Sequence, residues 1–150
     1  MNTKIIYVAF FAISLFSCKK ETKNNIESTP KIEEVVDESG TLKLNKGEKW
    51  IANPETHIGV IKMDSILKVF KSETNKEYIT LGESLSKQTS FIISKCNMKG
   101  EPHEQLHLVL VPMLDEINII KESQSQDDKN KALSNLKNLI SSYFMHFKTQ

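Results

Sequence analysis

Apolar residues recur at intervals of three and four along four separate stretches of the chain, which is the spacing of one face of an α-helix. These stretches cover about residues 54–72, 75–99, 102–122 and 130–147. Each is long enough for a helix of about 30 Å, and short loops join them. Such helices bury their apolar faces most simply against one another. The sequence therefore predicts an all-α fold, an antiparallel up-down-up-down four-helix bundle.

Proline and glycine residues indicate where these helices begin, end and bend. Asn53 followed by Pro54 is typical of a helix start, because proline fits the first helical turn. Gly100 is placed to end the second helix. Pro112 removes one backbone hydrogen bond from the third helix, so we expect a kink there. Gly82 lies inside the second helix, where it costs about 1 kcal/mol relative to alanine.

The chain begins with a short positive and apolar segment. Lys4 precedes an apolar run over residues 5–16, which ends at Ser17-Cys18 and is too short to be typical of a transmembrane helix. A cysteine in this position resembles the lipobox of bacterial lipoproteins, in which cleavage precedes the cysteine and its thiol is diacylated. The resemblance implies a lipoprotein signal peptide over residues 1–17 and a lipidated Cys18, which anchors the chain to a membrane. Ordinary secretion and a retained anchor are the alternatives.

Residues 18–49 are predicted to be a flexible linker behind this anchor. They are polar and dense in charge, so they carry too few apolar side chains to order themselves. The four-helix domain then covers residues 50–150. The expected location is the bacterial cell envelope. Lys19-Lys20-Glu21 lacks an aspartate sorting signal, which by resemblance to known sorting rules favours the outer membrane, facing the periplasm or the surface.

The charge balance excludes several classes of function. The 20 basic residues are all lysine and are matched by 19 acidic residues, whereas proteins that bind nucleic acid through phosphate contacts usually show a basic excess. None of the 5 glycines belongs to a phosphate-binding loop. We therefore expect no nucleic-acid partner. We also expect no enzyme activity, because the sequence shows neither a substrate cleft nor an oxyanion donor. The membrane, reached through the lipid anchor, is the one partner that the sequence indicates.

Side chains that commonly bind metal ions fall at one end of the predicted bundle. One histidine lies in the first turn of the first helix, and a cysteine and a methionine lie at the end of the second. Two further histidines open the third helix, and another closes the fourth. These residues are His57, Cys96, Met98, His103, His107 and His146.

The central part of this set predicts a site for a soft metal ion. His103 and His107 are four residues apart, so their rings project from one face of the third helix. Cys96 and Met98 approach across the turn at Gly100. A thiolate, a thioether and two imidazoles suit Cu(I), or Zn(II) where a second nitrogen such as that of His57 replaces the thioether. The predicted ligands are Cys96, Met98, His103 and His107, with His57 and His146 as further candidates.

The same residues also fit a purely structural interpretation. Cys96 and His107 continue the stripes of Ile92 and Leu110, so the thiol can act as a small core residue and the imidazole can bond a loop carbonyl. A second alternative is a protein-interaction module without a ligand. Its surface would be the aromatic stripe near the end of the chain, although a stripe at helical spacing is more often core. The stripe comprises Tyr143, Phe144, Met145 and Phe147.

Two chemical alternatives use other pairs of residues. A b-type haem would need facing axial ligands, for which His146 with His57 or Met63 offers candidates, but the stripes contain no run of small residues to make room. A nucleophile pair of Cys96 and His107, oriented by Glu104, would also need a substrate cleft and an oxyanion donor that the sequence does not show.

One segment of the chain resembles known proteins. It runs Cys96-Asn97-Met98-Lys99-Gly100-Glu101-Pro102-His103-Glu104-Gln105-Leu106-His107, and residues 49–56 upstream belong to the same resemblance. It resembles a group of small, uncharacterised bacterial lipoproteins in which a C-x-M-K-G-x-x-H-x-x-L-H signature joins the central helices. The resemblance covers about residues 49–148. It implies a helical domain associated with the cell envelope, and it implies no established activity.

Overall fold

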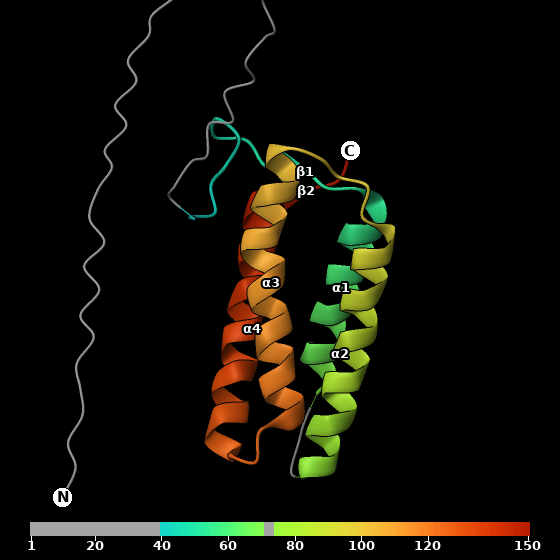
Figure 1. The fold of residues 1–150 in the computed structure, drawn as a ribbon, viewed down its shortest axis with the longest axis vertical. Coiled ribbons are helices and arrows are strands. Elements are labelled where there is room, and N and C mark those ends of the chain that lie inside the picture. Colours follow the sequence, from blue (N-terminus) through green and yellow to red (C-terminus); the bar gives the residue numbers. More distant parts are fainter. Residues whose placement is uncertain (1–39, 71–73) are drawn as a thin grey trace, which may run out of the picture. The chain divides into compact units, whose positions relative to one another are not determined.

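The computed structural model of the chain describes residues 40–70 and 74–150 (Figure 1). This part is all-α, with four helices and one pair of two-residue strands, which confirms the predicted fold class. The predicted signal peptide, the predicted lipidated Cys18 and linker residues 18–39 lie outside it. In chain order the elements are β1 (Trp50–Ile51), α1 (Pro54–Val69), α2 (Asn75–Lys95), α3 (Glu101–Glu122), α4 (Gln126–His146) and β2 (Phe147–Lys148).

Residues that precede each helix help to set where it starts, and the sequence analysis identified only some of them. Asn53 precedes α1 as expected, with Pro54 in the first turn. Thr74 and Glu77 form a reciprocal capping box at the start of α2. α4 begins at Gln126, earlier than the predicted start near residue 130, because the Ser125 side chain accepts a hydrogen bond from the Asp128 N–H. The polar run before α4 is therefore partly helical.

Contacts between helix ends gather at one end of the domain, which we call the site end. The side-chain amide of Asn53 donates to the Lys95 carbonyl at 3.2 Å and so joins the start of α1 to the end of α2. β1 pairs with β2 in parallel, with Trp50 opposite Phe147, and joins the start of α1 to the end of α4. Figure 1 shows both strands beside the α2–α3 loop. The sequence did not predict this pair, because two residues show no alternation.

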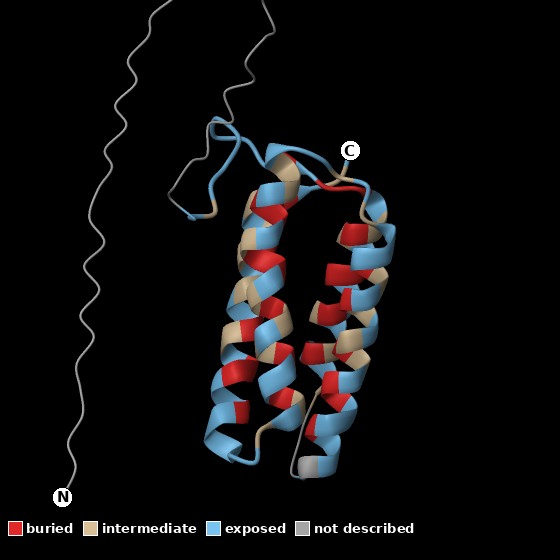
Figure 2. Cartoon of the chain, in the orientation of Figure 1, coloured by how far each residue is buried: buried red, intermediate tan, exposed pale blue. Residues whose placement is uncertain are grey.

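The core lies between the helices, and buried positions occur on each of them (Figure 2). Two glycines allow close helix contacts. A Cβ atom on Gly59 of α1 would lie 2.3 Å from Ile92 Cγ1 of α2, and one on Gly82 of α2 would lie 2.7 Å from Lys121 Cβ of α3. Gly82 is therefore required by packing, which the sequence analysis took only as a local weakness. At neither position can a methyl group be added without movement of a neighbour.

Residues before β1 contact the helices although the sequence placed them in the linker. The Lys43 N–H donates to Gln105 Oε1 at 2.8 Å, and the Trp50 indole N–H donates to the Lys43 carbonyl at 2.6 Å. Leu42 packs against the core. The predicted domain start at residue 50 is therefore several residues too late, because these backbone groups have partners that composition alone does not reveal.

Candidate functional site

The loop between α2 and α3 carries the predicted ligands. α2 ends where the Cys96 N–H donates to the Ile92 carbonyl at 2.8 Å. Gly100 has φ of +63°, and its carbonyl accepts from the His103 and Glu104 N–H groups at 2.9 and 3.1 Å. A positive φ favours glycine, so Gly100 permits the chain reversal that places α3 next to α2. α2 ends at Lys95, before the predicted end at residue 99, so Cys96 caps the helix and Met98 lies in the loop that follows.

The reversal brings a thiol and an imidazole together. The Cys96 sulfur lies 3.6 Å from His103 Nδ1, and both side chains are half-buried. Cys96 is the only cysteine in residues 40–70 and 74–150. The sequence paired Cys96 with His107 in its nucleophile alternative, but the structure pairs it with His103. The reason is that the first turn of α3, and not the second, meets the loop.

The other two predicted ligands lie beside this pair. The His107 ring centroid lies 4.3 Å from that of His103, and His107 is exposed, so it is not a core residue. Met98 is half-buried and packs against the core. Within the described ranges, no three His, Cys, Asp or Glu side chains converge closely enough to hold a metal ion. The close contact is thus between one sulfur and one nitrogen.

His57 is engaged by a buried tyrosine. Its Nδ1 atom lies 3.2 Å from the Tyr143 hydroxyl, and its ring lies edge-on to Phe144 with centroids 5.7 Å apart. Burial lowers the pKa of His57, and the nearby Lys49 charge lowers it further. Burial also raises the pKa of Tyr143 above its usual range, and a negative charge on Cys96 adds to this. Both shifts favour a neutral hydroxyl and a neutral imidazole, and the tautomer of His57 decides which of the two donates.

His146 is also engaged, within its own helix. Its Nδ1 lies 2.8 Å from the Ser142 carbonyl oxygen. A carbonyl can only accept, so Nδ1 carries the proton, and Nε2 is the nitrogen of His146 that keeps a free lone pair. The structure therefore brings Cys96, His103 and His107 together, and gives His57 and His146 other partners.

The aromatic stripe of α4 and β2 is core for the most part. Tyr143 and Phe147 are 0% and 1% exposed, and their rings stack with centroids 5.0 Å apart. Phe144 is half-buried, and only Met145 is largely exposed, at 58%. Met63, a candidate haem ligand, is completely buried in the core. The interaction surface expected on this stripe is therefore reduced to Met145.

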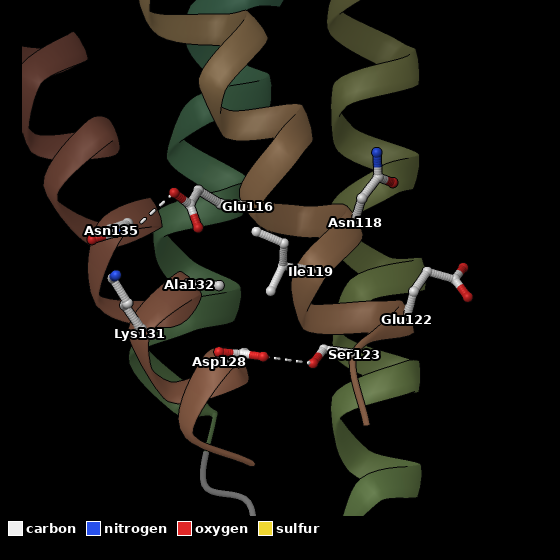
Figure 3. Close-up of a pocket in the computed structure, with 9 residues that line it drawn as sticks. All are labelled: Glu116, Asn118, Ile119, Glu122, Ser123, Asp128, Lys131, Ala132 and Asn135. Carbon is white, nitrogen blue, oxygen red and sulfur yellow. Dashed lines mark hydrogen bonds between the residues drawn. The ribbon is translucent and has the colours of Figure 1, made fainter. Parts of the chain in front are cut away.

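A surface cavity of about 640 Å³ lies between α3 and α4, away from the site end (Figure 3). Polar side chains meet across it: Asn135 Nδ2 donates to Glu116 Oε1 at 2.9 Å, and the Ser123 hydroxyl donates to Asp128 at 3.4 Å. Figure 3 shows Glu122 pointing away from these pairs. Since the polar groups that meet here bond one another, the candidate site remains the Cys96–His103 pair.

The sequence analysis missed Tyr143 as a polar residue of the site end. Tyr143 belongs to the aromatic stripe, so its spacing indicated a core position and gave no sign of the contact that its hydroxyl makes.

Within the described residues, no helix is both long and apolar enough to cross a membrane. Comparison of the chain with family models, curated proteins and solved structures found no match.

Proposed function

We propose that this chain is a lipid-anchored domain of the bacterial cell envelope that binds a soft metal ion, Cu(I) or Zn(II), and is not an enzyme. In this proposal the four helices form the antiparallel up-down-up-down bundle, and Cys18 carries the lipid. The resemblance of the Cys96–His107 segment to small bacterial lipoproteins supports the location. The observation that carries the metal site is the separation of 3.6 Å between the Cys96 sulfur and His103 Nδ1.

That separation matches what two ligands of one ion require. Metal–sulfur and metal–nitrogen bonds at a zinc site are about 2.3 and 2.0–2.1 Å. With the two atoms at their present distance, an ion bonded to both would have a sulfur–ion–nitrogen angle of about 110°. This angle is close to the tetrahedral value and not far from the trigonal one. The pair can therefore accept an ion without moving apart or together.

The environment of the pair suits an ion that enters from the solvent. His103 lies in the first turn of α3, and Cys96 caps the end of α2. Neutral imidazole is the form that binds metals. Cys96 and His103 are half-buried, so an ion can enter from the solvent and still lose part of its hydration. Metal binding requires the thiolate form of Cys96 and the neutral form of His103.

A thermal melting experiment tests the metal site. We expect the full chain carrying Cys18→Ser, stripped of metal, to melt about 10 °C higher when Cu(I) or Zn(II) is present at about 100 times its Kd, which is worth about 2.7 kcal/mol. Cys96→Ser and His103→Ala should each abolish the shift. The matched control is His146→Ala, at the same end of the domain, which should keep it. If neither ion changes the melting temperature of the Cys18→Ser parent, the proposal is contradicted.

A labelling experiment tests the anchor separately. Cells expressing the chain and supplied with a tagged fatty acid should label the wild-type protein and not Cys18→Ser. We expect the wild-type protein in the membrane fraction and the variant in the soluble fraction, because the acyl chains supply the membrane affinity. Equal labelling of both forms would remove the lipoprotein assignment and leave the metal site unaffected.

A further inference from the structure

We propose that residues 41–49, which we call the strap, hold the first turn of α3 in place at the site end. Opening of the strap then loosens the contact between Cys96 and His103. The rest of the predicted linker precedes the strap in the chain, so a load on the linker acts on the strap before it reaches the helices. The inference concerns the metal-free protein and does not depend on the proposed metal ion.

In Figure 1 the strap lies beside the start of α3, to which it is bound at two points. The Lys43 N–H donates to Gln105 Oε1 at 2.8 Å, and the Lys43 ammonium group lies 3.8 Å from the Glu101 carboxylate. Glu101 and Gln105 are four residues apart, so they lie on one face of α3. Gln105 is buried, and opening of the strap would take this donor away from its amide oxygen. Because a buried acceptor that loses its partner is costly, the closed strap and the first turn of α3 stabilise each other.

His103 belongs to the same part of α3 and points to the opposite side. It is two residues from both Glu101 and Gln105, which is about 200° around the helix axis. On that side its Nδ1 lies 3.6 Å from the Cys96 sulfur. The first turn of a helix has fewer backbone hydrogen bonds than the turns that follow, so it depends on contacts from outside. The strap on one side and the α2–α3 loop on the other therefore fix the position of the His103 ring together.

The strap can open while the helices stay folded, because few of its side chains are buried. Of residues 41–49 only Leu42 is half-buried, and the others are exposed. The buried Trp50, which follows the strap, donates its indole N–H to the Lys43 carbonyl at 2.6 Å. A segment with so little buried surface opens locally at a small fraction of the cost of global unfolding.

A tight turn closes the strap. Asn45 and Glu48 exchange two backbone hydrogen bonds, at 2.8 and 2.9 Å, and Lys46 and Gly47 between them have φ of +50° and +91°. Positive φ at both central positions favours Asn followed by Gly, so Lys46→Asn should favour the closed strap. Gly47→Ala should open it, because alanine strains this backbone conformation. A Cβ atom on Gly47 would have no atom within 4 Å, so the variant disturbs no other contact.

Amide hydrogen exchange, resolved by NMR, tests the strap in the metal-free full chain carrying Cys18→Ser. Lys43→Pro removes both contacts with α3, because proline has neither an N–H nor a charge. We expect the amides of His103 and Glu104 to exchange about fivefold faster in this variant. The matched control Lys43→Ala keeps the N–H and loses the exposed ion pair, so it should change these rates by less than about twofold. The Lys129 N–H, which bonds at the far end, should be unchanged in both variants.

Alkylation of the thiol gives a second measurement. Cys96 is the one cysteine left in the chain carrying Cys18→Ser, and at about pH 10 it is ionised, so its alkylation rate reports its exposure. We expect Lys43→Pro and Gly47→Ala to raise this rate about threefold, because the His103 ring moves away from the sulfur. Lys46→Asn should lower it.

If Lys43→Pro leaves either the exchange rates in the first turn of α3 or the alkylation rate unchanged, the inference is wrong. Equal acceleration of exchange at Lys129 would show a general loosening of the domain and would also contradict the inference. Turn variants that change the alkylation rate in the same direction would do so too. Because no metal is present in these measurements, the proposed metal site is decided separately, by its own melting experiment.

Discussion

The two ends of the helices hold polar clusters of different chemistry. At the far end, where α2 and α4 begin, the Tyr78 hydroxyl donates to Asn130 Oδ1 at 2.7 Å and accepts from Gln126 Nε2 at 2.8 Å. The buried ammonium group of Lys129 lies 5.4 Å from the Tyr78 ring. At the site end, a half-buried sulfur meets one imidazole nitrogen at 3.6 Å.

This difference distinguishes the structural cluster at the far end from the proposed metal-binding pair at the site end. The far-end groups are strong donors and acceptors that saturate each other, so the cluster stabilises the fold and offers little to a ligand. A sulfur–nitrogen contact is a weak hydrogen bond, and both atoms are good metal ligands. The contrast predicts that changes at the far end affect stability alone, whereas changes at the site end also affect metal binding.

The largest effect on stability is expected for Gly59→Ala, near the site end. The added methyl group would lie 2.3 Å from Ile92 Cγ1, so α1 and α2 must separate or Ile92 must leave its rotamer. We expect a loss of about 2–3 kcal/mol in the free energy of unfolding, measured by urea denaturation. Because Ile92 accepts the Cys96 N–H, metal affinity should also fall. Ser90→Ala, an exposed change in α2, is the control and should change neither quantity.

Tyr78→Phe should have the next largest effect. It removes the hydroxyl that joins Asn130 and Gln126 and keeps the ring. We expect the free energy of unfolding to fall by about 1–2 kcal/mol, because two bonding partners lose their contact. Cu(I) affinity, measured by chelator competition, should stay unchanged. A large change in affinity would show that the two ends are coupled and would break the comparison.

Gly82→Ala distinguishes the sequence account from the structural one. The sequence alone predicts that alanine stabilises α2 by about 1 kcal/mol. The structure places the new methyl group 2.7 Å from Lys121 Cβ and 3.2 Å from its Cα, so the contact with α3 must open. We expect a net loss of about 1 kcal/mol in urea denaturation, with metal affinity unchanged. A stabilised variant would show that α2 and α3 adjust freely at this contact.

The smallest effect is a pH dependence that arises at the site end. The pKa of His57 is lower in the folded protein than its ordinary value of 6.5, so the unfolded chain binds more protons as the solution is acidified. The stability that neutral His57 supplies is therefore present above about pH 6.5 and is lost as the pH falls below it. His57→Gln should flatten the change in melting temperature between pH 7 and pH 5. An unchanged slope would mean that another group carries the dependence.

Much of the fold could be predicted from the sequence, because long apolar stripes and the residues at Asn53-Pro54 and Gly100 act locally. The helical class and the turn between α2 and α3 follow from such signals. The β1–β2 pair and the contact of Lys43 with Gln105 could not be predicted, since they join segments far apart in the chain. These contacts depend on how the helix ends meet.

The candidate site was predictable in its residues but not in its pairing. The spacing of His103 and His107 indicated one face of a helix, and their rings are adjacent. Which imidazole contacts Cys96 depends on where α3 starts relative to the loop. His103 and His107 lie about one helical turn apart, so a shift of α3 by one turn would exchange them. The role of Tyr143 could not be predicted, because its ring fits the core pattern and its hydroxyl contacts His57 in another helix.

X-ray absorption at the copper edge of the Cu(I)-loaded full chain carrying Cys18→Ser tests the central claim most directly. If Cys96 and His103 bind the ion, the spectrum will show sulfur and nitrogen neighbours at bonding distance, and Cys96→Ser will lose sulfur scattering while Tyr78→Phe will not. Copper surrounded by nitrogen and oxygen alone, with the same spectrum in Cys96→Ser, would contradict the account.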